Sequence, residues 1–93
     1  MKYDVYLSAE VIRQMAFHNK SGNLKLVKKM SALLQELSEH PRMGTGQPER
    51  LRHTSGIEIW SRRLSDKHRL VYQILENQIR VDVLSALGHY DDK

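Results

Sequence analysis

Residues 57–87 read IEIWSRRLSDKHRLVYQILENQIRVDVLSAL and contain three runs of strand-forming residues. Valine, isoleucine, tyrosine and tryptophan recur in these runs, and such side chains favour strands. The polar segments Ser65-Asp66-Lys67 and Glu76-Asn77 separate the runs and are suited to tight turns. The stretch therefore predicts an antiparallel meander with strands at Ile57–Leu64, His68–Leu75 and Gln78–Leu87.

Upstream of the meander, the sequence predicts one strand, Met1–Leu7, and two helices. Ser8 is a suitable N-cap for the first helix, and Ser21-Gly22-Asn23 is a turn that separates it from the second. The second helix should end at His40-Pro41, because proline disfavours helical conformation in the preceding residue. The expected apolar stripes are Val11, Ile12, Met15 and Ala16 in the first helix, and Leu24, Val27, Met30, Leu34 and Leu37 in the second.

The segment Pro41–Pro48 is rich in glycine and proline and is interpreted as a connection, followed by a short strand at Leu51–His53. The order strand–helix–helix–strands predicts an α+β fold, with two helices packed on one face of a small, mainly antiparallel twisted sheet. With 93 residues, the chain fits a single domain, residues 1–93.

Composition excludes several classes of function. The chain has no cysteine, so disulfides, thiolate metal sites and a cysteine nucleophile are ruled out. Its histidines show no metal-ligand spacing, and neither a metal site nor a cofactor is expected. No apolar run approaches the roughly 20 residues that span a bilayer, and Met1–Leu7 is too short and polar for a signal peptide. We therefore expect a cytoplasmic protein with no membrane partner.

The formal charge of +4 and a pI near 9.6 favour a polyanionic partner. Arginines, whose planar guanidinium suits phosphate, cluster between Arg42 and Arg69 and include Arg52, Arg62 and Arg63. Lys25, Lys28 and Lys29 form a second basic group at the start of the second helix. We interpret these side chains as RNA-binding, while a solvated helix face is an equally good interpretation of the lysines.

A ribonuclease that uses no metal needs a base for the ribose 2′-hydroxyl, an acid for the leaving 5′-oxygen and cations at the phosphate. Glu49, Arg69, His89 and Tyr90 offer such groups, and a meander can bring distant strand ends together. Each also has a structural interpretation. Glu49 could pair with nearby arginines, Arg69 could bind turn carbonyls, His89 could be an exposed terminal residue, and Tyr90 could hold the tail on the sheet. Trp60 is interpreted as core or core edge.

The order and spacing of these residues resemble the central signature of YoeB toxins, a branch of the RelE superfamily. The resemblance is carried by Gly46–His53, Gly56, Trp60–Leu64, His68–Tyr72 and His89-Tyr90. The glutamate–histidine pair is typical of the YoeB branch, whereas many RelE relatives rely on basic residues instead. Asp91-Asp92-Lys93 extend beyond the His-Tyr ending of the family.

The resemblance implies a role for each matching residue. Glu49 would be the general base and His89 the general acid, while Arg69 would stabilise the phosphate and Tyr90 would position the substrate. Arg52 and Arg63 match basic residues near the family's site.

The resemblance also implies an activity and partners. The chain would be the toxin of a type II toxin–antitoxin system that cleaves messenger RNA in the ribosomal A site and so inhibits translation. A YefM-like antitoxin would neutralise it, a homodimer is expected, and operator DNA would be bound only as the toxin–antitoxin complex. Two alternatives remain open: a toxin that inhibits a protein target, as ParE relatives inhibit gyrase, and a plain RNA-binding module.

Overall fold

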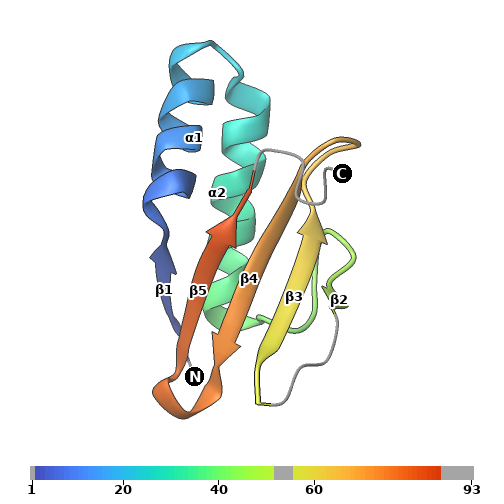
Figure 1. Ribbon diagram of the computed structural model, residues 1–93. Coiled ribbons are helices and arrows are strands. Elements are labelled where there is room, and N and C mark those ends of the chain that lie inside the picture. Colours follow the sequence, from blue (N-terminus) through green and yellow to red (C-terminus); the bar gives the residue numbers. More distant parts are fainter. Residues whose placement is uncertain (1, 52–55, 87–93) are drawn as a thin grey trace.

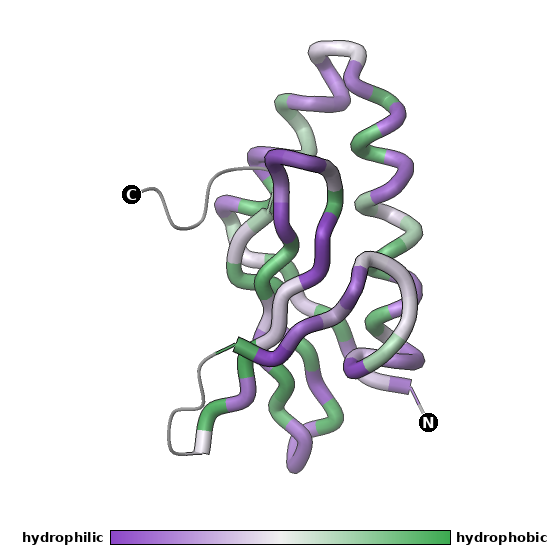
Figure 2. Tube along the Cα trace, turned by 90° about the vertical axis from the view of Figure 1, so that its right-hand side faces the viewer, coloured by the Kyte–Doolittle hydropathy of each residue, from purple (hydrophilic) through white to green (hydrophobic). Residues whose placement is uncertain are grey.

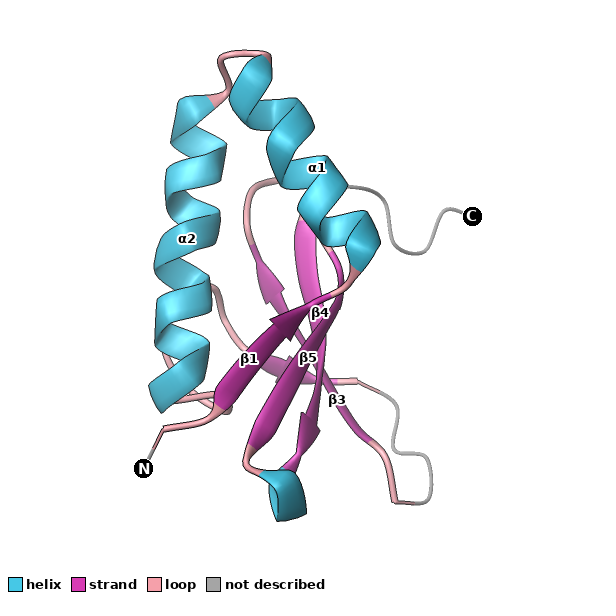
Figure 3. Cartoon of the chain, turned by 90° about the vertical axis from the view of Figure 1, so that its left-hand side faces the viewer, coloured by secondary structure: helices cyan, strands magenta, loops and turns pink. Residues whose placement is uncertain are grey.

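The computed structural model describes residues 2–51 and 56–86 and contains two helices packed on a five-stranded sheet (Figure 1). The elements are β1 (Asp4–Leu7), α1 (Ala9–Lys20), α2 (Leu24–Glu39), β2 (Glu49–Arg50), β3 (Glu58–Arg63), β4 (Arg69–Leu75), the 3-10 helix η1 (Glu76–Gln78) and β5 (Arg80–Ser85). The sheet order is β1-β5-β4-β3-β2; only β1 and β5 are parallel, and both helices lie on one side (Figure 3). The predicted α+β fold is confirmed.

Local signals set the ends of the helices. The Ser8 hydroxyl accepts a hydrogen bond from the Val11 amide at 3.2 Å, so Ser8 is the N-cap of α1. The chain reverses at Ser21-Gly22-Asn23, where Gly22 adopts a φ of +83° that glycine tolerates best. The helix α2 ends with His40 as its C-cap, directly before Pro41. These three sequence predictions are confirmed.

The meander is also confirmed, because β3 pairs with β4 and β4 pairs with β5, both antiparallel. The short strand before it was predicted two residues too late. It begins at Glu49 and Arg50, which pair with Ser61 and Trp60 of β3, whereas the prediction began at Leu51. Arg52 and His53 of the predicted range lie outside the described residues. The pairing begins early because the Gly46 carbonyl already accepts a hydrogen bond from the Arg63 amide at 2.7 Å. The chain therefore reaches β3 before the apolar residue Leu51.

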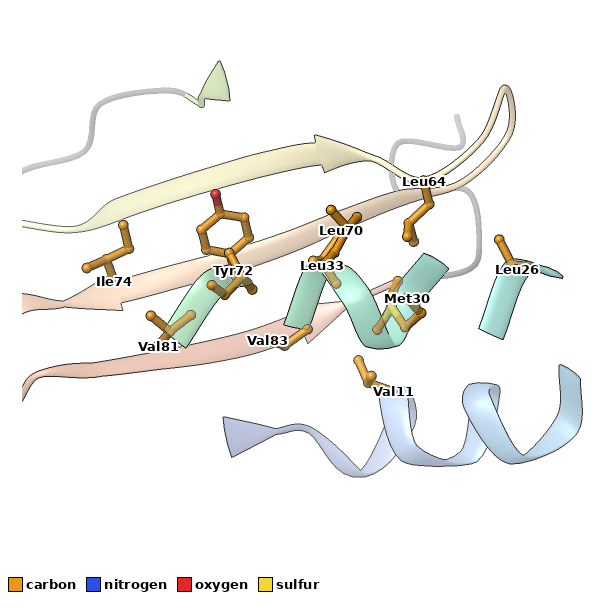
Figure 4. Packing of buried hydrophobic residues seen from close by; sticks show 12 residues of the cluster. Val11, Leu26, Met30, Leu33, Leu64, Leu70, Tyr72, Ile74, Val81 and Val83 are labelled. Carbon is orange, nitrogen blue, oxygen red and sulfur yellow. The ribbon is translucent and has the colours of Figure 1, made fainter. Parts of the chain in front are cut away.

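The core lies between the sheet and the inner sides of α1 and α2 (Figure 4). Val11, Met30 and Leu37 are buried there as predicted. Three residues of the predicted stripes are wrong: Ile12 and Leu24 are 54% and 60% exposed, and Ala16 is exposed as well. The turn between α1 and α2 extends beyond the sheet (Figure 1), and Leu24 is the first residue of α2 after this turn. Buried residues that the predicted stripe on α2 omitted are Leu26 and Leu33.

Within residues 2–51 and 56–86, no helix has the length and apolar character required to cross a membrane.

Candidate RNA-cleavage site

The face of the sheet that is turned away from the helices, here called the outer face, carries three of the predicted site residues. Residues paired across an antiparallel ladder share a face, and successive residues of a strand alternate between faces. Arg63 is paired with Arg69 across β3 and β4, and Glu49 is paired with Ser61, two residues before Arg63. Glu49, Arg63 and Arg69 therefore lie on one face, and all three are exposed.

This group combines one carboxylate with two guanidinium groups near one end of the sheet. The register places Arg63 and Arg69 directly opposite each other at the base of the β3–β4 turn. Within the described part of the chain, the Glu49 side chain makes neither a hydrogen bond nor an ion pair, and Arg52, a neighbouring arginine that could pair with it, lies outside the described residues. An exposed carboxylate beside paired cations can accept a proton close to a bound phosphate.

Arg62 was predicted to contact RNA, and the structure contradicts this. Its side chain is on the opposite face of β3 from Arg63 and is 0% exposed. An arginine has five N–H groups, and here each has an acceptor within the protein. Nε donates to the Tyr72 hydroxyl, and one Nη1 hydrogen bond goes to the Glu36 carboxylate. The remaining acceptors are the carbonyls of Thr45, His40 and Met43. No N–H group remains for a phosphate.

The predicted RNA-binding lysines lie at the same end of the molecule as Arg63 and Arg69. Lys25, Lys28 and Lys29 are exposed on the first turns of α2. Lys25 and Lys29 line a pocket of about 410 Å³ between the start of α2 and the β3–β4 turn. That turn is strongly hydrophilic (Figure 2). The basic groups thus occupy both sides of one hairpin, which suits an extended polyanion.

Three predicted site residues, Arg52, His89 and Tyr90, lie outside the described residues. Their roles remain predictions. The part of the chain that the structure describes contains no group of three or more His, Cys, Asp or Glu side chains that could hold a metal ion.

Arg42, which the sequence placed at the edge of the arginine cluster, has a structural role. Its guanidinium binds the carboxylates of Glu58 at 2.8 Å and Glu76 at 2.9 Å. The hydrogen bond from Arg42 holds the pKa of Glu58 below its usual value, and the Trp60 indole N–H binds the same carboxylate at 2.8 Å. Trp60 packs against the core, as predicted for a residue at the core edge.

The Glu36 carboxylate should make folding dependent on pH. Burial alone would raise its pKa, but hydrogen bonds from the Thr45 amide and from Arg62 outweigh burial, and the pKa of Glu36 is lowered from 4.5. A lowered pKa in the folded state stabilises the fold above the unfolded value, and this stability is lost as pH falls through the folded value. We expect the free energy of unfolding in urea to fall below about pH 4.5.

The matched variants for this prediction are Glu36→Gln and Glu76→Gln. Glutamine at position 36 removes the titrating group, so the free energy of unfolding of Glu36→Gln should fall less at acid pH. Glu76 is exposed, so Glu76→Gln should keep most of the fall in stability at acid pH. If the free energy of unfolding of Glu36→Gln falls at acid pH as much as that of the parent, Glu36 is not the cause of the pH dependence.

Solved structures with this fold include toxins of two bacteria. A YoeB/ParE toxin from Agrobacterium tumefaciens superposes with a TM-score of 0.80 at 26% identity, covering 94% of this chain and 99% of that one. The toxin in a YoeB–YefM complex from Staphylococcus aureus gives a TM-score of 0.74 at 27% identity, covering 97% of this chain and 100% of that one.

Sequence comparison then identifies the family. The family model described as the YoeB-like toxin of bacterial type II toxin–antitoxin systems matches residues 9–90, and the chain belongs to that family. Toxin YoeB of Escherichia coli K12 is 38% identical over 58 residues, which cover 61% of this chain and 67% of the relative. Toxin YoeB of Streptomyces coelicolor is 35% identical over 74 residues, covering 78% and 83%. The predicted resemblance is confirmed, and the chain is a toxin of a type II system.

Proposed function

We propose that this toxin is an endoribonuclease that cleaves messenger RNA in the ribosomal A site and thereby inhibits translation. The observation that carries the proposal is that Glu49 is exposed on the same face of the sheet as Arg63 and Arg69, which are exposed and paired across β3 and β4. A gyrase inhibitor or a plain RNA-binding module needs no acid–base groups.

The proposed reaction is an internal transfer of the phosphoryl group. Glu49 accepts the proton of the ribose 2′-hydroxyl, and the 2′-oxygen attacks the adjacent phosphorus. The bond to the 5′-oxygen breaks, and His89 donates the proton that this leaving oxygen requires. The products are a 2′,3′-cyclic phosphate and a free 5′-hydroxyl. Because the nucleophile is the 2′-hydroxyl, the enzyme would cut RNA and leave DNA intact.

The basic residues are proposed to stabilise charge and hold the substrate. Arg69 and Arg63 donate hydrogen bonds to the phosphate oxygens as negative charge develops on them. Tyr90 positions the nucleotide at the scissile bond. The RNA backbone or the surrounding ribosomal RNA contacts the remaining basic side chains, Arg52, Lys25, Lys28 and Lys29.

The proposal extends to partners and location. A YoeB–YefM complex and a YoeB dimer have been solved for Staphylococcus aureus. These structures support a YefM-like antitoxin and a homodimer for this chain, with operator DNA bound only by the toxin–antitoxin complex. The proposed substrate is messenger RNA on translating ribosomes, so a cytoplasmic location is proposed as well.

A reconstituted translation reaction tests the proposal. A defined message is translated with purified ribosomes, the protein is added, and 5′ ends are mapped by primer extension beside a reaction that lacks ribosomes. We expect cuts at A-site codons only when ribosomes are present, and loss of these cuts in His89→Gln. Intact message in both reactions, with the protein folded, would overturn the proposal in favour of a protein target.

Arg69→Ala should reduce the cleavage rate by about 10²-fold, the scale for removing one donor that stabilises transition-state charge. The fold should persist, because Arg69 is exposed at the start of β4. Single-turnover cleavage on stalled ribosomes measures the effect, and Lys67→Ala in the adjacent turn is the matched loss of one cation. Equal losses in the two variants would indicate a general charge effect in place of a specific phosphate contact.

A further inference from the structure

We infer that Arg62 is a positioning residue for Glu49: it fixes the 40–46 loop, which places β2 and the Glu49 carboxylate on the outer face. This inference rests on the proposed function, because it assigns Arg62 a part in cleavage through the general base. Arg62 touches neither RNA nor the reacting atoms.

The first step is the convergence of the loop on one buried guanidinium. Arg62 Nη1 donates to the Thr45 carbonyl at 3.2 Å, and Nη2 donates to the Met43 carbonyl at 2.8 Å and to the His40 carbonyl. These three acceptors span the loop from the end of α2 almost to β2. One side chain thereby fixes the loop at its beginning, middle and end.

Two neighbours of Arg62 reinforce the same loop. The Tyr72 hydroxyl accepts from Arg62 Nε at 3.1 Å and donates to the Pro41 carbonyl at 2.7 Å. The Glu36 carboxylate, which is ion-paired with Arg62, accepts from the Thr45 amide at 2.8 Å. Arg62, Tyr72 and Glu36 come from β3, β4 and α2, so the loop is held by the sheet and the helix together.

The second step links the loop to Glu49. Gly46 is docked on β3, since its carbonyl accepts from the Arg63 amide at 2.7 Å. Its φ is +89°, and a Cβ there would lie 2.9 Å from the Arg63 carbonyl oxygen. Only Gln47 and Pro48 separate Gly46 from Glu49. The strand β2 has two residues, which is short for a pairing that must fix its position. The Leu51 amide, which donates to the Ile59 carbonyl at 2.7 Å, anchors the chain after Glu49, and the loop anchors it before Glu49.

Arginine is the residue type that this arrangement requires. An apolar side chain would leave three loop carbonyls without the donors that Arg62 supplies, and the Glu36 carboxylate would keep only its hydrogen bonds from Thr45. Lysine has three N–H donors on a flexible stem in place of five in a planar fork. It keeps the positive charge beside Glu36 but cannot bind all the loop carbonyls, so Arg62→Lys should loosen the loop while preserving the ion pair.

A double-mutant cycle on cleavage tests the inference. Single-turnover rates on ribosome-bound message are compared for the parent, Arg62→Lys, Glu49→Gln and the double variant, with folding checked by circular dichroism. We expect Arg62→Lys to lower the maximal rate about 10-fold, with the ribosome concentration at half-maximal rate unchanged. In the Glu49→Gln background, the same change should have almost no further effect, because a misplaced base and an absent base are equivalent.

Matched variants separate positioning from general destabilisation. Arg80→Lys alters an arginine that binds Asp82 in β5, and it should leave the rate unchanged. If Arg62→Lys does not fold, Gly46→Ala replaces it, with Gly22→Ala as its control. Both glycines have similar φ values, +89° and +83°, but a Cβ at Gly22 meets no atom within 4 Å.

The outcomes distinguish this inference from the proposed function. Equal losses from the loop variant with and without Glu49 would overturn the positioning role and leave the nuclease proposal intact, and so would a loop variant that cleaves like the parent. Parent-like cleavage by Glu49→Gln would contradict the general-base assignment itself, and the inference would fall with it. Loss of the loop effect in the Glu49→Gln background supports the inference.

Discussion

Glu49→Gln should slow ribosome-dependent cleavage by about 10²-fold or more, the usual scale for removing a positioned base. Glutamine has nearly the same size and shape but cannot accept the 2′-hydroxyl proton. Glu49 is exposed on the edge strand β2 and has no ion pair within the described residues. The substitution should therefore leave the fold and ribosome binding unchanged, so that the effect appears in the rate of the chemical step.

The measurement is a single-turnover time course with saturating toxin, in which message cleavage is followed on stalled ribosomes. Glu39→Gln is the matched control, because Glu39 is an exposed glutamate at the end of α2. It loses the same charge away from the outer face and should cut at the parent rate. If Glu49→Gln and Glu39→Gln cut equally fast, Glu49 is not the base and another group must accept the proton.

Local patterns in the sequence were sufficient for most of the fold. The helix ends were predicted correctly because their signals act on residues close by in the sequence. These signals are the Ser8 hydroxyl, the Ser21-Gly22-Asn23 turn and Pro41. The meander was equally accessible, because strand-forming runs separated by short turns leave few alternatives. The position of β2 depends on a distant partner, the Arg63 amide, and was therefore misplaced.

The candidate site was harder to predict, because the sequence does not reveal which face of β3 an arginine occupies. Alternation requires Arg62 and Arg63 to point to opposite faces, but a charged pair gives no indication of which one is buried. The deciding contacts come from Glu36 and the 40–46 loop, far away in the sequence. The same holds for Arg42, whose partners Glu58 and Glu76 become neighbours only when the sheet forms.

Arg62 and Arg63 are adjacent in β3 but differ in environment, so the same substitution should affect stability very differently at the two positions. Arg62→Met should reduce the free energy of unfolding by about 3 kcal/mol or more, because it removes a fully buried guanidinium together with its ion pair to Glu36, which is partly exposed and keeps its hydrogen bonds from Thr45. Three loop carbonyls also lose their donor, which adds to the cost. For a small domain, whose total stability is about 5–15 kcal/mol, this loss is a large fraction.

Arg63→Met is the matched control, since it is the same substitution one residue later on the exposed face. It should change stability by no more than about 0.5 kcal/mol, as is usual for surface positions. Urea unfolding of both variants measures the difference. Under the proposed function, cleavage should show the complementary result, because folded Arg63→Met lacks a phosphate contact. Equal stability losses would mean that the two side chains share one environment. This would contradict the assignment of Arg62 to the face that packs on the helices and of Arg63 to the outer face.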